Sequence, residues 1–400
     1  MVPPWVDRGI ARAYDRAMRA RGRSTVVATV LLLAASCTGS NTSSTSSHSS
    51  PSPTTTSPTP EPEGPLVDVG ALGACDPARP GRGQTVTFVA AGAAWALDPR
   101  DGDVTCLFET ADAGPFAWGP LGDRLLLGGG EVLQLGAGAQ AVAEGIGATF
   151  GWSKPTGKSL VYVADGATRP TKLPIASDDP FELADLPSGE YQALAYHPSG
   201  LAMAVSLYDG AEPQIYLATN EGAREKRVVH GISATSFPSL AFSAGGTELF
   251  YLAEHKGGYV QIHRIDLEAA DLIDGWRSQA PLKRASGLFL AGGVNDPLAF
   301  TAATGGCATS VAMLGFTDQM RPALDDVEGP THALGFLDDR TLLVGAGGCG
   351  GTPLDLYAVT ARGATSLASG VDAGASRAVG TSEAAAPLPE DLLGEIQEFG

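Results

Sequence analysis

A short unit recurs six times between residues 116 and 338, and it limits what this chain can fold into. Each copy places an apolar, usually aromatic, anchor before a turn, and an apolar run follows the turn. Repeats of this size typically hold four strands that cannot bury both faces alone, so neighbouring units must pack on one another. Successive anchors are separated by 34, 44, 46, 48 and 46 residues, and they are Trp118, Trp152, Tyr196, Phe242, Leu290 and Phe336.

Glycine, proline and short apolar runs indicate strands rather than helices. The 52 glycines and 28 prolines fall largely between β-like runs such as 86–89, 160–163, 248–252 and 342–344. Beyond residue 85, the repeating units keep no 3.6-residue apolar period for long, so helices are expected to be scarce. The sequence therefore predicts an all-β propeller. The regular spacing of the anchors argues against the alternative, an ordinary β-sandwich.

The number of blades follows from the two ends of the repeat region. Residues 85–108 contain three expected strands, 86–89, 94–97 and 104–108, but lack the first strand of a blade. We expect residues 375–381 to supply that strand and to close the ring. The six anchored units and this composite make seven blades. Six blades is the alternative, if the 34-residue second unit is incomplete.

The repeats also resemble a known family. Residues 150–157 read Phe-Gly-Trp-Ser-Lys-Pro-Thr-Gly, and a later strand at 214–217 reads Gln-Ile-Tyr-Leu. In this order of anchor, turn and strands, residues 85–380 resemble the WD40-like β-propeller repeats of the TolB family. The departures are Gly119 and Tyr196-His197, where Trp-Ser is usual. The resemblance implies the propeller fold and transfers no site residue, because that family's partners are bound by surfaces rather than by a motif.

The amino terminus has the features of an export signal. Three arginines within residues 19–23 precede an apolar run over 26–35, which is too short for a bilayer core that needs about 20 residues. Small residues then lead to Cys37. This stretch resembles the lipobox of a bacterial lipoprotein of actinobacterial type, although Ala34 stands where Leu is usual. The resemblance implies cleavage after Ser36 and acyl chains such as palmitate on Cys37, which anchor stably when two or more are present.

The next segment is expected to be a tether. Residues 38–64 contain sixteen Ser or Thr and five Pro in 27 positions, so they cannot bury a core and should be disordered. The expected order is a signal peptide (1–36), the lipidated Cys37 with its linker (37–64), the propeller (65–383) and a tail (384–400). We expect the protein to be exported and lipid-anchored at the outer face of the cell membrane.

Four cysteines remain besides Cys37, and an even number in an exported chain suggests two disulfides. Three pairings are possible. We favour Cys75–Cys106, which would pin the start of the domain to the outermost strand of the composite blade. We also favour Cys307–Cys349, because both follow a second strand in Gly-Gly-Cys contexts 42 positions apart. Free buried thiols are the alternative.

Several sequence features argue against nucleic-acid binding, dinucleotide binding, metal binding and nucleophilic catalysis. A formal net charge of −18 argues against general nucleic-acid binding, which needs clustered Lys and Arg. The Gly-x-Gly-x-x-Gly run at 345–350 is followed by Pro353 and a strand, not by the helix that a dinucleotide needs. No Cys or His spacing indicates a metal, and no Gly-x-Ser-x-Gly elbow occurs. No cofactor is expected. Carboxylate pairs, interpreted as turn residues, occur at 178–179, 325–326 and 338–339.

The functional prediction is a binding or scaffold module for a protein, peptide or glycan of the cell envelope. A hydrolase or lyase with its site in the central channel is the alternative, and a structural envelope role is a third possibility. Whether the protein is an enzyme stays open, with a non-enzyme favoured, and a monomer is expected. The tail places Leu388, Leu392, Ile396 and Phe399 at helical spacing among acidic residues. It is interpreted as packing on the domain or as a docking peptide.

Overall fold

The computed structural model describes residues 64–377, apart from short gaps. The gaps are 112–115, 137–138, 176, 178, 220–224, 228–232, 268–273, 278–281, 284, 291–297, 306–307, 315–319, 323, 325–329 and 348–352. One 3-10 helix, η1 (Val69–Ala71), precedes the strands. Within the described residues, no helix combines the length and the apolar character needed to cross a membrane.

The described strands form seven antiparallel sheets. The first contains β29 (Ala373–Ser376), β1 (Val86–Ala90), β2 (Ala93–Leu97) and β3 (Val104–Glu109). The second contains β4 (Ala117–Trp118), β5 (Arg124–Leu126), β6 (Val132–Leu135) and β7 (Ala139–Ala143). The third contains β8 (Phe150–Trp152), β9 (Ser159–Tyr162), β10 (Thr171–Pro174) and β11 (Phe181–Glu182).

Four further sheets follow in chain order. The fourth contains β12 (Glu190–Tyr196), β13 (Ala202–Tyr208), β14 (Pro213–Thr219) and β15 (Glu225–Arg227). The fifth contains β16 (Ser236–Phe242), β17 (Glu248–Glu254), β18 (Tyr259–Asp266) and β19 (Asp274–Arg277), with β20 (Leu282–Lys283) also paired to β18. The sixth contains β21 (Ala285–Leu290), β22 (Leu298–Gly305), β23 (Ala308–Leu314) and β24 (Met320–Pro322). The seventh contains β25 (Thr331–Asp338), β26 (Thr341–Gly347), β27 (Leu354–Thr360) and β28 (Gly363–Val371).

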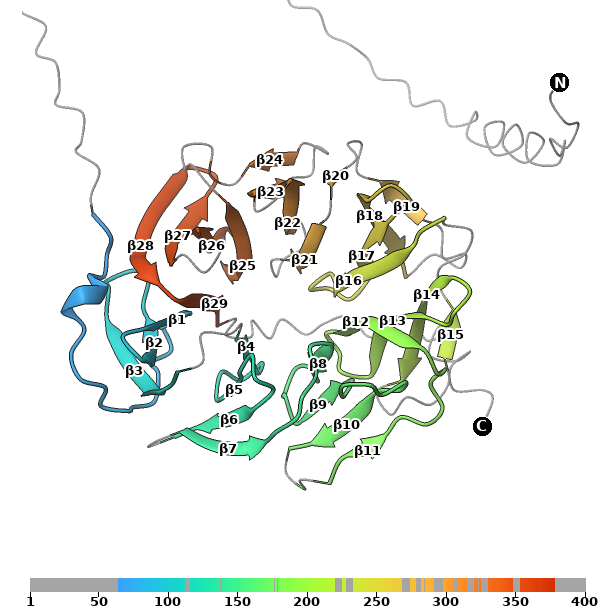
Figure 1. Ribbon diagram of the computed structural model, residues 1–400, viewed down its shortest axis with the longest axis horizontal. Coiled ribbons are helices and arrows are strands. Elements are labelled where there is room, and N and C mark those ends of the chain that lie inside the picture. Colours follow the sequence, from blue (N-terminus) through green and yellow to red (C-terminus); the bar gives the residue numbers. More distant parts are fainter. Residues whose placement is uncertain are drawn as a thin grey trace, which may run out of the picture. The chain divides into compact units, whose positions relative to one another are not determined.

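Buried apolar side chains fill the spaces between consecutive sheets, and the last sheet packs on the first. Each cluster draws its members from two neighbouring sheets, and β16 lies against β21 at the remaining junction. Representative members are Leu107 with Leu125, Leu126 with Leu160, Val161 with Leu207, Ile215 with Phe237, Ala299 with Phe336, and Leu343 with Phe88. This arrangement confirms the predicted all-β propeller, whose sheets are labelled in Figure 1.

The anchors mark the ends of the first strands. Trp118, Trp152, Tyr196 and Phe242 are the last residues of their strands and are buried between sheets. Leu290 ends β21, and Phe336 lies buried inside β25. The short unit that begins at Trp118 carries four strands, β4 to β7, although its spacing to the next anchor is only 34 residues. The six-blade alternative assumed that this unit was incomplete.

The composite sheet joins the two ends of the domain, as Figure 1 shows for β29 beside β1. Its first strand is Ala373–Ser376, so the prediction of 375–381 was wrong in its bounds. The register explains the difference, because Ser376 pairs with Val86, the first residue of β1. The ladder ends where the amide of Arg377 donates to the carbonyl of Thr85, at 2.7 Å.

Residues before β1 are fastened to the outside of the propeller. The structure contains the predicted Cys75–Cys106 disulfide, with 5.4 Å between the Cα atoms, and it links this segment to the outermost strand β3. The amide of Val67 also donates to Leu367 of β28, at 2.9 Å. Cys307 and Cys349 lie outside the described residues, so their predicted pairing stays a prediction.

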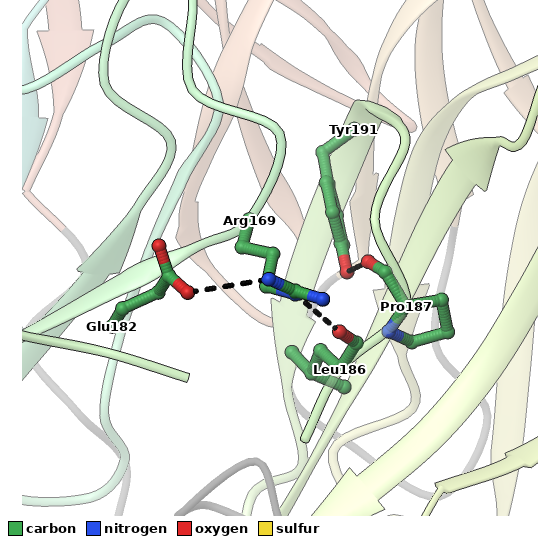
Figure 2. A network of polar contacts seen from close by, with 5 residues as sticks. All are labelled: Arg169, Glu182, Leu186, Pro187 and Tyr191. Atoms are coloured by element: carbon green, nitrogen blue, oxygen red, sulfur yellow. Dashed lines mark hydrogen bonds and ion pairs between the residues drawn. The ribbon is translucent and has the colours of Figure 1, made fainter. Parts of the chain in front are cut away.

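A polar network holds the connection from the third sheet to the fourth (Figure 2). Arg169 donates from Nε to the carbonyl of Leu186 at 3.0 Å and makes a 3.5 Å ion pair with Glu182. The Tyr191 hydroxyl donates to the carbonyl of Pro187 at 2.6 Å. These contacts fix the segment that leads from β11, the last strand of the third sheet, to β12, the first strand of the fourth.

Replacing Tyr191 with phenylalanine tests this network with little change in side-chain volume. We expect the free energy of unfolding to fall by about 1 kcal/mol, because the carbonyl of Pro187 loses a protein donor. Urea denaturation of the purified variant measures the effect. The half-exposed Tyr259→Phe is the control and should change stability by less than about 0.5 kcal/mol.

Candidate functional site

Three consecutive turns form one continuous surface, which we call the anchor rim. They are 119–124, 153–158 and 197–201, and each joins the first and second strands of its sheet. The turns touch directly. A Cβ atom built on Gly157 would lie 2.8 Å from Cδ of Pro120, and one built on Gly200 would overlap the carbonyl oxygen of Lys154. The rim therefore spans three sheets without a break.

Side chains from one sheet hold the turn glycine of the next sheet in the same way at three junctions. Arg377 donates to the carbonyl of Gly122 at 2.8 Å, and Arg124 donates to that of Gly157 at 2.9 Å. Nε2 of His197 lies 2.9 Å from the carbonyl of Gly246. These three glycines have φ values of +64°, +57° and +75°, a region that other residues enter only at a cost. The recurring glycine thus serves the turn and the junction together.

Arg377 closes the ring. This buried residue donates to the carbonyls of Gly81 at 2.8 Å and Gln84 at 3.3 Å, in addition to that of Gly122. Its guanidinium lies 5.0 Å from the ring centroid of Trp118. Burial, and then the neighbouring charge of Arg79, lower the pKa of Arg377 from its ordinary value. The acceptors of its hydrogen bonds are neutral carbonyls, and the negative charge of Asp123 acts in the opposite direction by raising the pKa.

His197 is a neutral imidazole, judged by its partners. The amide of Ser199 donates to Nδ1 at 3.1 Å, so Nδ1 is an acceptor, and Nε2 carries the proton that faces the carbonyl of Gly246. The ring is fully buried and packs edge-on against Phe242, with centroids 5.1 Å apart. Burial is the main reason that the pKa of His197 lies below its ordinary value.

The neutral ring makes the stability of the fourth-to-fifth junction depend on pH. Because the pKa of His197 is lower in the folded state, the unfolded chain binds more protons in mildly acidic solution. The stabilisation that His197 provides is complete above its unfolded pKa and is lost as the pH falls through the folded pKa. Compared with His197→Gln, the wild-type chain should lose more stability between about pH 7.5 and pH 5. Urea denaturation across this range measures it, and parallel curves would contradict it.

The outer surface of the anchor rim combines apolar and basic side chains. Leu121 is 59% exposed and Leu201 is 52% exposed, although large apolar side chains are usually buried. Lys158 lies exposed on the turn between them, and Lys154 on the same turn has accessible side-chain surface but an ammonium group whose burial lowers its pKa. No carboxylate forms an ion pair with either lysine within the part of the chain that the structure describes. A surface of this kind suits a partner that carries both acidic and apolar groups.

A second cluster lies within the fifth sheet and is mostly internal. His263 stacks on Tyr251 with centroids 5.0 Å apart, and His255 stacks on Tyr259 at 4.7 Å. Nδ1 of His255 lies 2.6 Å from the carbonyl of Ser233. Tyr251 and His263 are buried, so these rings pack the sheet. His263 therefore has a structural role within the sheet.

The other motifs occupy turns and strand ends. Asp338 caps its turn by accepting from the amide of Arg340 at 2.8 Å, as predicted for a carboxylate pair in a turn. The glycine run at 345–350 begins inside β26, and the next described element is the strand β27. Within the described residues, no group of three or more His, Cys, Asp or Glu side chains could hold a metal ion. Outside the described residues lie Cys37, Asp178 and the pair at 325–326.

Comparisons with known proteins agree on the fold. No family profile matches the chain, and no curated protein sequence matches it either. Among solved structures, it is similar to the β-propeller domain of Myceliophteria thermophila Cps50 (Swd1), with 14% identity, a TM-score of 0.50, and coverage of 68% of this chain and 92% of that one. It is also similar to a prolyl endopeptidase, with 14% identity, a TM-score of 0.50, and coverage of 74% and 49%.

The TolB protein of Acinetobacter baumannii is a third similar structure, with 16% identity and a TM-score of 0.44. The match covers 61% of this chain and 65% of that protein. At these identities the similarity concerns the fold alone. The similarity to the Cps50 (Swd1) β-propeller domain agrees with the seven sheets described above, and the chain has the β-propeller fold.

Proposed function

We propose that the chain is an exported, lipid-anchored envelope protein whose propeller binds a protein or peptide partner through the anchor rim. The observation that carries the binding site is the exposure of Leu121 and Leu201 on either side of Lys158, which has no ion-pair partner among the described residues. Exposed apolar side chains that share a patch with uncompensated charge are typical of interaction surfaces.

The rigidity of the rim supports this proposal. Its turns are fixed by the hydrogen bonds of Arg124, His197 and Arg377 to turn glycines of the following sheets. A surface that is already ordered loses less conformational entropy when a partner binds. The rim is therefore suited to binding without rearrangement.

Export and anchoring rest on the sequence around Cys37. Mass spectrometry of the native protein should find an amino terminus at Cys37 that carries diacylglycerol. Cys37→Ser should release the chain from the membrane fraction. Recovery of an intact, unacylated amino terminus from membranes would contradict the anchoring part of the proposal.

The binding site is tested with photo-crosslinking residues placed one at a time on the full chain in its envelope. p-Benzoylphenylalanine at Leu121 or Leu201 should trap a partner of the same mass. The matched control is Phe181, which is 43% exposed on the outer strand β11. Equal adducts at all three positions, or none at the two rim positions, would overturn the proposal.

A further inference from the structure

We propose that the acidic tail, residues 384–400, docks on the anchor rim of its own propeller. The inference goes beyond the proposed function, because it names an intramolecular occupant of the rim. It uses the surface of the rim and does not depend on the identity of any external partner.

The first argument is the place where the described chain ends. Arg377 is the last described residue, and its side chain contacts Gly122 within the first turn of the rim. Residues 378–387 separate it from Leu388, the first large apolar residue of the tail. Ten residues span about 33 Å when extended. The tail is thus connected at the edge of the rim by a segment with ample reach.

The second argument is charge complementarity. The tail contains four carboxylates and no Lys or Arg, the carboxylates being Glu390, Asp391, Glu395 and Glu398. Basic side chains lie on the rim and on the segment that leads into β1. Arg79, Arg82 and Lys158 are exposed, and Lys154 lies on the same turn as Lys158 with a pKa that burial lowers. The positive charges of Arg124 and Arg377 add to these, because both guanidiniums are held by neutral oxygens.

Asp123 is a carboxylate on the rim itself, and the basic groups named above outnumber it. Its charge raises the pKa of Arg377, whereas burial and the charge of Arg79 lower that pKa. Oδ2 of Asp123 also faces Nε2 of Gln134, at 3.4 Å. A protein with a formal net charge of −18 therefore displays a local basic surface, which attracts an acidic segment.

The third argument is the match of apolar groups. At helical spacing, one face of the tail carries four apolar side chains, which are Leu388, Leu392, Ile396 and Phe399. The rim offers Leu121 and Leu201 as exposed apolar contacts on neighbouring turns. An amphipathic helix could cover both leucines while its carboxylates face the lysines between them.

The test uses the full chain with p-benzoylphenylalanine in place of Leu392. We expect an intramolecular crosslink to a peptide from one of the three rim turns. Hydrogen exchange of residues 388–399 should be slowed about tenfold relative to the double variant Lys154→Glu, Lys158→Glu. In about 0.5 M salt, where the Debye length is roughly 4 Å, part of the protection should be lost.

A charge-swapped pair keeps the inference falsifiable if the rim variant folds poorly. Glu395→Lys, Glu398→Lys combined with the rim double variant should restore the crosslink that either pair alone removes. Lys256→Glu, an exposed lysine on the turn between β17 and β18, is the matched control and should leave the crosslink unchanged.

Two outcomes would overturn the inference. They are a crosslink that joins two chains, and exchange of the tail that does not respond to the rim charges. Both are separable from failure of the proposed function, since the partner test reads an intermolecular adduct at Leu121 and Leu201. A tail that docks while no partner is trapped, even after residues 384–400 are removed, would reject only the proposed function.

Discussion

Replacing Arg377 with methionine should lower the free energy of unfolding by about 3–5 kcal/mol, the largest effect that we expect from a single side chain. Methionine has similar length and is apolar, so the variant keeps most of the packing on Trp118. The carbonyls of Gly81, Gln84 and Gly122 would lose their guanidinium donor. Urea denaturation gives the loss, and hydrogen exchange should show faster opening of β29 and β1.

The control for Arg377 is Arg82→Met, an exposed arginine on the same closing segment. It should change stability by less than about 0.5 kcal/mol. If Arg377→Met costs no more than this control, the guanidinium does not secure the closure, and the pairing of β29 with β1 must hold without it.

Gly200→Ala should cost about 3 kcal/mol, whereas Gly166→Ala should cost about 1 kcal/mol. The two glycines have the same φ of +76°, so the backbone strain of the substitution is alike. They differ in the room available for a side chain. A Cβ on Gly166 meets nothing within 4 Å, whereas one on Gly200 overlaps the Lys154 carbonyl oxygen. That oxygen belongs to the backbone, so it cannot move away by a change of side-chain rotamer.

The difference between the stability losses of the two alanine variants measures the effect of the close approach between neighbouring turns. Thermal or urea denaturation of both proteins, made in the same background, supplies the comparison. Equal losses would mean that the third and fourth sheets have room to separate at the rim, and the rim would then be less rigid than the contacts indicate.

The parts of the fold that depend on local chemistry could be predicted from the sequence. Four first strands end at a buried aromatic anchor, because an apolar ring next to a turn can be buried only against the neighbouring sheet. The pairing of Cys75 with Cys106 also followed from the expected place of β3. Such features use residues that are near one another in the chain or that repeat.

The bounds of the closing strand, the side chains that secure it and the rim could not be predicted in the same way. Arg377 and Gly81 are 296 residues apart, and nothing in the run Ala-Gly-Ala-Ser indicates a strand by itself. β29 forms because its partner is already in place. The exposure of Leu121 and Leu201 also depends on which turn faces outwards, and in the sequence each is one leucine beside a glycine.

The pairing of β29 with β1 sets an order for biogenesis. The strand that completes the first sheet is made some 280 residues after its partner, so the nascent chain exposes the edge of β1 until almost the whole domain has emerged. A polypeptide cut short before Ala373 would keep that edge open and remain prone to proteolysis and aggregation. Closure of the ring therefore requires a translation product that extends at least through Ser376.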